Sequence, residues 1–275
     1  MKKEILHKIS QIAIWSLFIA TLLIFLGFSR SQRSKVLCSE IVVDIVDTTG
    51  FYFVEPKDIL ELLSDKGYKL IGKSIESIPL NYLEYYIRNH PSVKNAEVYT
   101  TLDGKLHVEV QQRNPILRII NYNNEGYYID NDGALFPLSE KYTARVLVVN
   151  GNLNEPYNLR YTRNASETKK WDELGRAFLI DDLYQLAKFI QTDDFYKSLV
   201  EQIYVNNDNE IEIVPKVGHF VILLGSTDDL NEKFENLRSF MQIALPREGW
   251  DHYSFINLKY KNQIVCTKKE GYESE

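Results

Sequence analysis

The sequence predicts an α+β protein with a single N-terminal transmembrane helix, a β-α-α-β-β domain, and a larger mixed β-rich domain with helices on one face. Three observations predict this fold class. The run from Ile9 to Ser29 has no ionisable side chain, hydrophobic periods of two and 3.6 residues alternate along the rest of the chain, and Asn, Asp and Gly clusters separate the periodic segments. The 275 residues are 44% hydrophobic and 12% aromatic, which is enough material for two modest domains.

The predicted boundaries divide the chain into a cytoplasmic tail (1–8), a transmembrane helix (9–29), a first domain (36–113), a second domain (114–268) and a flexible tail (269–275). Twenty-one helical residues span about 31 Å, close to the thickness of a bilayer core of about 30 Å. A cleaved signal peptide is the alternative, but its apolar region has only about 7–15 residues. Basic residues flank both sides of the segment, and the short N-terminal tail favours a cytoplasmic N-terminus with the main body outside the cytoplasm.

Charge is unevenly distributed along the chain. Residues 1–35 carry six basic side chains and one acidic one, so residues 36–275 hold 26 basic and 37 acidic side chains, a net charge of −11. An acidic body repels phosphate backbones, so no nucleic-acid partner is expected. Two cysteines, Cys38 and Cys266, are too few for a small fold built on disulfides, and whether either is oxidised stays open.

The first domain follows from local signals taken in order. β-branched residues predict a strand at 37–46, Pro56 opens a helix to Asp65, and apolar residues three to four apart predict a second helix at 80–89 that ends before Pro91. Alternating segments at 93–101 and 106–112 flank Asp103-Gly104, which is a hairpin signal.

The second domain begins near Pro115. Alternation and β-branched residues predict its strands, and apolar spacing predicts its helices. The expected strands are 116–122, 127–130, 145–149, 200–205, 210–214, 219–224, 253–260 and 263–267, with helical segments at 180–190 and 228–242.

One segment matches the consensus of a catalytic motif. It is Gly67-Tyr-Lys-Leu-Ile-Gly72-Lys73-Ser74, which fits the phosphate-binding P-loop. A P-loop needs a strand directly before it and a helix directly after it. Here a helix precedes the loop and Pro79 follows shortly, so Lys73 is expected to be a solvated loop residue. The five histidines are dispersed, and no metal-ligand or nucleophile set is spelled, so no cofactor and no enzymatic activity are expected. Asp130 and Asp132 are expected in a turn between strands rather than in a calcium loop.

The order of parts resembles the bacterial cell-division family FtsQ, called DivIB in Gram-positive bacteria, and the first domain resembles a POTRA domain. The resemblance rests on Pro91-Ser-Val-Lys-Asn-Ala-Glu-Val98 with the exit Gln112-Arg-Asn-Pro115, on Ile129-Asp-Asn-Asp-Gly-Ala-Leu-Phe136, on Val221-Ile-Leu-Leu-Gly225 with Lys233-Phe234, and on Ile256-Asn-Leu-Lys-Tyr260. The spellings NQIVC and YYIDNDGALFP suggest the Bacteroidota branch. Asn257 and Lys259 stand where the family more often has an acidic residue and an arginine.

The resemblance implies a non-enzymatic, single-pass inner-membrane scaffold that links division proteins at the septum, with its main body in the periplasm. Two alternatives remain. One is a membrane-tethered POTRA chaperone in envelope protein assembly, and the other is a P-loop NTPase that uses Lys73. The chaperone alternative predicts further POTRA units or a barrel, and neither is spelled in the sequence.

The expected partner site is the last strand of the chain. A terminal hairpin strand is a natural sheet edge, and its unpaired N–H and C=O groups can pair with another chain. The resemblance implies that the partner is an FtsB-like member of the FtsB/FtsL coiled-coil pair, bound by strand addition with Tyr260 at the contact. Other division proteins are expected to bind the POTRA-like domain. The predicted partner-binding residues are Tyr260, Lys261, Asn262, Gln263, Ile264, Val265 and Cys266. The alternative is that Tyr260 and Ile264 only pack the domain core.

Overall fold

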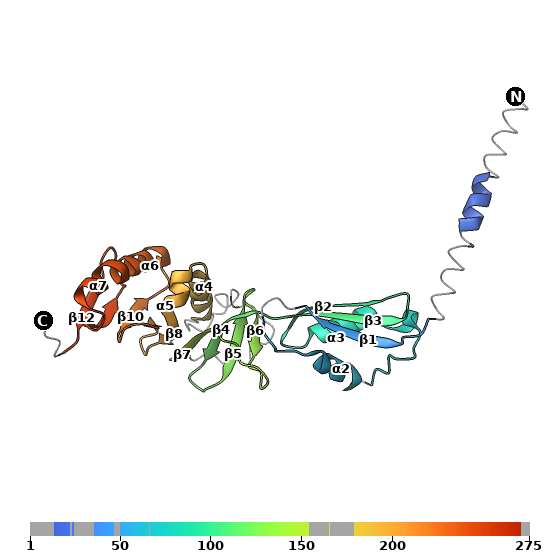
Figure 1. Ribbon diagram of the computed structural model, residues 1–275, viewed down its shortest axis with the longest axis horizontal. Coiled ribbons are helices and arrows are strands. Elements are labelled where there is room, and N and C mark those ends of the chain that lie inside the picture. Colours follow the sequence, from blue (N-terminus) through green and yellow to red (C-terminus); the bar gives the residue numbers. More distant parts are fainter. Residues whose placement is uncertain are drawn as a thin grey trace, which may run out of the picture. The chain divides into compact units, whose positions relative to one another are not determined.

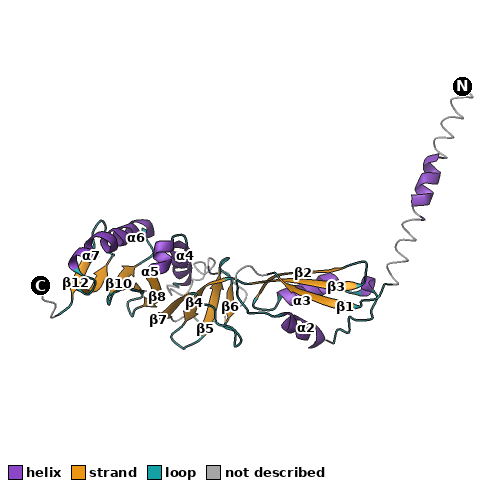
Figure 2. Ribbon diagram, in the orientation of Figure 1, coloured by secondary structure: helices purple, strands orange, loops and turns teal. Residues whose placement is uncertain are grey.

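The computed structural model describes residues 14–22, 24, 36–46, 50–65, 67–153, 165 and 179–270. They divide into two compact units, which are considered separately: unit 1 comprises Met1–Thr48 and Val54–Gln112, and unit 2 comprises Thr49–Phe53 and Arg113–Glu275. Figure 1 follows the chain from the N-terminus to the C-terminus, and Figure 2 separates its helices from its strands. Secondary structure is mixed α+β in both units, in agreement with the predicted fold class.

The N-terminal apolar segment is described only in part. Residues 14–22 and 24 are helical, and Ile14, Trp15, Leu17 and Phe18 are each more than half exposed. Within the described ranges, no helix is long and apolar enough to cross a membrane. The rest of the predicted membrane segment 9–29 and the predicted tail 1–8 lie outside the described residues.

Unit 1 is a three-stranded sheet with helices on one face. Its elements are β1 (Glu40–Ile45), α2 (Pro56–Asp65), a 3₁₀ turn (Ile75–Ser77), α3 (Leu80–Arg88), β2 (Val93–Thr100) and β3 (Lys105–Gln112). The strand order is β1-β3-β2, with β1 parallel and β2 antiparallel to the central strand. The predicted β-α-α-β-β order is therefore confirmed.

The core of unit 1 lies between the two helices and one face of the sheet. Ile59 and Leu63 of α2 and Leu83 and Ile87 of α3 are buried, spaced four residues apart so that each pair lies on one side of its helix. They face every second residue of β3, where Leu106, Val108 and Val110 are fully buried. The hydrophobic spacing seen in the sequence thus becomes the packing interface.

Unit 2 is built on a nine-stranded mixed sheet of order β12-β11-β10-β9-β8-β7-β4-β5-β6. Its strands are β4 (Pro115–Ile120), β5 (Gly126–Asp130), β6 (Leu135–Pro137), β7 (Leu147–Gly151), β8 (Val200–Val205), β9 (Ile211–Pro215), β10 (Val221–Gly225), β11 (Tyr253–Asn257) and β12 (Val265–Lys268). Its helices are α4 (Ile180–Gln191), α5 (Asp194–Leu199), α6 (Leu230–Ser239) and α7 (Leu245–Glu248), with a π-helical turn at Phe240–Ala244 between the last two. Three parallel pairings, β4 with β7, β7 with β8 and β10 with β11, require crossover connections.

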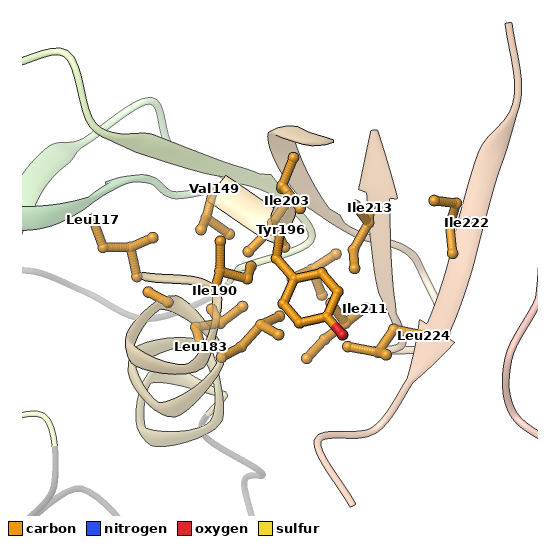
Figure 3. Packing of buried hydrophobic residues seen from close by; sticks show 14 of the residues in the cluster. Leu117, Val149, Leu183, Ile190, Tyr196, Ile203, Ile211, Ile213, Ile222 and Leu224 are labelled. Atoms are coloured by element: carbon orange, nitrogen blue, oxygen red, sulfur yellow. The ribbon is translucent and has the colours of Figure 1, made fainter. Parts of the chain in front are cut away.

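The helices of unit 2 lie on one side of the sheet, as Figure 2 shows, and the main core lies beneath them. Leu183 and Ile190 of α4 pack against strand residues such as Ile203 and Ile213, all of them nearly or fully buried (Figure 3). Phe234 of α6 belongs to the same buried cluster. Burial of this continuous apolar layer supplies the main driving force for folding of the unit. The prediction of helices on one face of a β-rich domain is confirmed.

Several elements differ from the sequence-based expectation. Strand β6 and helices α5 and α7 are too short for periodicity to reveal them. The terminal hairpin is shorter than predicted, because β11 ends at Asn257 rather than Tyr260 and β12 begins at Val265 rather than Gln263. After the last pair, Asn257 opposite Val265, Leu258 continues the pairing with β10 by donating its N–H to the Leu223 carbonyl at 2.9 Å, and the turn to β12 follows.

Candidate functional site

The last strand, β12, is the edge of the sheet of unit 2. It pairs antiparallel with β11, with Asn257 opposite Val265, Ile256 opposite Cys266 and Phe255 opposite Thr267. Among the described residues, no strand pairs with its other side. The strand predicted to bind a partner is thus an edge strand in the fold. What binds there stays a prediction.

The direction of each backbone group along β12 follows from two hydrogen bonds. Lys269 donates its N–H to the His252 carbonyl at 3.0 Å, on the β11 side, and Leu258 donates to Leu223 on the far side of β11. Backbone groups alternate in direction along a strand, and the register shift between Tyr253 and Phe255 lies in β11, so the alternation of β12 is undisturbed. The N–H groups of Val265 and Thr267 therefore point toward β11, and those of Cys266 and Lys268 point outward from the sheet.

Side chains of the edge divide between two faces. Ile264 and Cys266 are half-buried and pack against the main core. Val265 is 45% exposed on the opposite face, and burial raises the pKa of the Cys266 thiol. The edge therefore presents the apolar side chain of Val265 on one face and the packed side chain of Cys266 on the other. Its outward backbone groups lie between these two faces.

The turn that joins β11 to β12 is anchored at several points. Asn262 adopts φ 58°, a left-handed conformation that asparagine tolerates, and donates its N–H to Glu232 of α6 at 3.1 Å. The Lys259 ammonium pairs with Glu210, and this hydrogen bond raises the pKa of Lys259. The Lys259 N–H also donates to the Asn257 side chain at 2.9 Å. These contacts hold the turn against α6 and against the residue preceding β9.

Tyr260 lies at the start of this turn and is 52% exposed. Its neighbours Lys261, Asn262 and Gln263 are exposed as well. The alternative that Tyr260 only packs the core is therefore wrong, while for Ile264 core packing is observed. The predicted residues form one continuous surface that runs from the turn into the edge strand.

Two small pockets lie beside the turn. One, of about 280 Å³, is lined by Asp182, Thr227 and Lys259 among others, and the second, of about 50 Å³, lies between α6 and Tyr260. Lys233 lines both and donates to the carbonyls of Leu224 at 3.1 Å and Ser226 at 2.8 Å. Burial lowers the pKa of this lysine. Sequence reasoning did not find these pockets, because their lining residues come from segments that are far apart in the chain, from Asp182 to Lys259.

The P-loop spelling does not form a phosphate cradle. Gly67 follows helix α2, the Gly72 N–H donates to the Cys38 carbonyl at 2.7 Å, and the Lys73 carbonyl accepts from Cys38 at 2.7 Å. Only a three-residue 3₁₀ turn follows. The loop amide of Gly72 is therefore used inside the fold, and the prediction of a structural loop is confirmed.

Asp130 lies at the start of a turn, as predicted. It accepts hydrogen bonds from the N–H groups of Asp132 and Ala134 at 3.0 and 2.7 Å and pairs with Arg113 at 2.8 Å. In the part of the chain that the structure describes, no group of three or more His, Cys, Asp or Glu side chains could hold a metal ion.

Two family comparisons bear on these domains. The model of the family described as "FtsQ/DivIB, C-terminal related" matches residues 114–267, more than half of the chain. The model of the POTRA-like domain matches residues 36–111. Comparison with curated proteins gives no match.

Proposed function

Because the chain belongs to the FtsQ/DivIB C-terminal related family and carries a POTRA-like domain, we propose that it is a non-enzymatic scaffold of the bacterial cell-division machinery. In this proposal it links septal division proteins through its two domains. The coiled-coil proteins of the FtsB/FtsL type bind unit 2, and other division proteins bind the POTRA-like domain. The observation that carries the partner site is the open outer edge of β12.

Strand addition at β12 is supported by its backbone geometry. A partner strand that pairs with the outward groups of Cys266 and Lys268 would extend the nine-stranded sheet by one strand. Each backbone hydrogen bond contributes about 0.5–1.5 kcal/mol net, so several are needed for a stable complex. Tyr260 adds an exposed aromatic ring at one end of the edge, and such rings often dominate the energy of an interface.

The charge around β12 favours an acidic partner segment. Lys259 and Lys261 precede the strand, and Lys268 and Lys269 end and follow it. Lys261 and Lys268 are exposed, so they are available to a partner. Opposite charges on the partner strand would set its register and speed its association.

We also propose that residues 9–29 anchor the protein in the inner membrane, with the N-terminus in the cytoplasm and both domains in the periplasm. The support is the length of the uncharged run, together with the helical conformation and exposed apolar side chains of residues 14–22. Such a helix finds its favourable environment in lipid. Fractionation of the full chain, followed by protease treatment of spheroplasts, tests this topology.

The edge proposal is tested by proline substitution at β12. Cys266→Pro removes an outward N–H and places a ring where a partner strand would pair, so we expect capture of the coiled-coil partner to weaken about tenfold or more. Cys266→Ala is the matched control, because it removes the same thiol and keeps the N–H. Val265→Pro removes an inward N–H, so we expect it mainly to destabilise the hairpin.

Tyr260→Ala should weaken capture and leave the fold intact, because the ring is half exposed. If folded Cys266→Pro captures the partner as well as Cys266→Ala does, and Tyr260→Ala also binds at wild-type strength, the partner site is elsewhere.

A further inference from the structure

Unit 1 has two sheet edges, and they differ in how their apolar side chains are covered. In the edge strand β2, Val93, Ala96 and Val98 are nearly or fully buried. In the edge strand β1, none of the six residues is fully buried, although four of them are the β-branched residues Ile41, Val42, Val43 and Ile45. Edge β1 thus leaves apolar surface uncovered that β2 does not.

The two edges also differ in protection against pairing. Natural edge strands are blunted by lysine, proline or a β-bulge. Strand β2 carries the exposed Lys94 and a register shift between Val93 and Asn95. Strand β1 pairs with β3 without interruption from Glu40 to Ile45 and contains neither lysine nor proline. Its exposed charged side chains are Glu40, which pairs with Lys105 of β3 at 2.9 Å, and Asp44.

The outward backbone groups of β1 follow from its pairing. Val46 donates its N–H to the Val110 carbonyl of β3 at 2.8 Å. Because directions alternate along a strand, Ile41, Val43 and Ile45 point their N–H and C=O groups away from the sheet. Before the strand, Leu37 bridges Ser74, so the same side of the chain is closed there. From Glu40 to Ile45, no described strand pairs with this side.

A row of three carboxylates crosses the face of the sheet opposite the helices. Asp44 of β1 lies opposite Glu109 of β3, which lies opposite Glu97 of β2. The Tyr99 hydroxyl donates to Glu109 at 2.7 Å, and this hydrogen bond is the main reason that the pKa of Tyr99 is raised. Like charges directly opposite one another destabilise a sheet. A cation added beside Asp44, at the open end of the row, would relieve that repulsion.

We propose that β1 is a second strand-addition edge, which binds an extended partner segment of alternating apolar and basic residues. Apolar residues of the partner would cover Ile41, Val43 and Ile45 on the helix side. Lys or Arg would alternate with them on the other face, where Glu40 is already paired with Lys105 and Asp44 is the carboxylate that a partner cation would meet. The proposal deepens the suggestion that the POTRA-like domain binds other division proteins, and it gives the partner a charge opposite to that expected at the lysine-flanked β12.

The test uses two acetylated and amidated octapeptides, in which Ile and Val alternate with Lys in one and with Glu in the other. Their binding to the full chain carrying Cys266→Pro is measured by fluorescence anisotropy, so that β12 does not contribute. We expect the Lys peptide to bind about fivefold or more tightly than the Glu peptide, because each cross-strand charge pair is worth about 0.2–1 kcal/mol. Asp44→Lys should reverse this preference.

Glu97→Lys is the matched control for charge. It makes the same charge change on β2, which lies two strands, or about 10 Å, from β1. A strand added to β1 would lie about 14 Å from β2. At physiological salt this distance exceeds the Debye length of about 8 Å, so the preference should change less than twofold. Val43→Pro removes an outward N–H and should weaken the Lys peptide about tenfold where the variant folds.

The proposal is wrong if the Lys peptide does not bind, if Asp44→Lys leaves the preference unchanged, or if Glu97→Lys shifts it as much as Asp44→Lys does. These outcomes are independent of the β12 proposal. Capture of the coiled-coil partner by the chain with wild-type Cys266 reports on β12 alone, so either edge can fail without the other.

Discussion

Asp130 is the residue of unit 2 whose removal should be most costly for the β5–β6 turn. It is 1% exposed, and its carboxylate holds three donors: the N–H groups of Asp132 and Ala134 on one oxygen, and Arg113 on the other. Asp130→Ala leaves the Arg113 guanidinium without its buried partner and two turn amides without an acceptor. Breaking a buried ion pair costs about 3–5 kcal/mol, so we expect the free energy of unfolding to fall by that amount.

Asp130→Asn separates the two contributions. The side-chain amide oxygen can still accept from both turn amides, while the charge that pairs with Arg113 is gone. Hydrogen bonds to a charged group are about twice as strong as neutral ones, so the asparagine variant should lose about half as much stability. Asp132→Asn is the control, because this neighbouring side chain is exposed and surface substitutions change stability by about 0.5 kcal/mol or less.

Urea unfolding followed by tryptophan fluorescence measures these differences, because Trp250 belongs to unit 2. The expected order of stability is wild type and Asp132→Asn, then Asp130→Asn, then Asp130→Ala. If Asp130→Asn costs as much as Asp130→Ala, the turn amides contribute little, and the argument from the three donors is refuted.

Three further outcomes follow from local chemistry. Lys73→Ala should leave cell division intact in a complementation assay, since its loop holds no phosphate cradle; loss of division at normal protein level would revive the NTPase alternative. Glu97→Lys should raise the urea midpoint of unit 1, because it interrupts the carboxylate row, and a lowered midpoint would contradict this. The hydrogen bond from Arg238 lowers the pKa of Asp193, so this pair stabilises the fold above the ordinary aspartate range and its contribution is lost as the pH falls below about 4. Asp193→Asn should therefore flatten the loss of thermal stability between pH 5 and pH 2, and an unchanged pH profile would refute the assignment.

The elements of both units follow from the sequence because their signals are local. Pro56 opens α2, Asp103-Gly104 joins β2 to β3, and apolar spacing places Leu83 and Ile87 on the buried side of α3. Each depends on residues within a few positions of one another, so the unfolded chain already carries the information. The family resemblance rests on the order of such locally determined segments, and the family models confirm it. The Bacteroidota branch stays a prediction.

The candidate site was predictable only in outline. A terminal hairpin indicates an edge strand, and β12 is an edge. Which N–H points outward depends on the register with β11 and on the bond from Leu258 to β10. For this reason the N–H of Cys266, rather than that of Val265, points outward from the sheet. Register in a hairpin depends on the geometry of its turn and on which face is buried, and here the turn extends from Leu258 to Ile264, longer than the sequence predicted.

Unit 1 gives the clearest case of a feature that tertiary structure alone decides. The sequence places an acidic residue on each of three predicted strands, namely Asp44, Glu97 and Glu109. Taken one by one, they look like ordinary solvent-exposed side chains. Only the strand order β1-β3-β2 and the register bring them into one row, and the same order leaves the outer edge of β1 without a paired strand among the described residues. The physical reason is that burial of the core selects which strands pair, so Asp44 and Glu109, 65 positions apart, become neighbours only when the core forms.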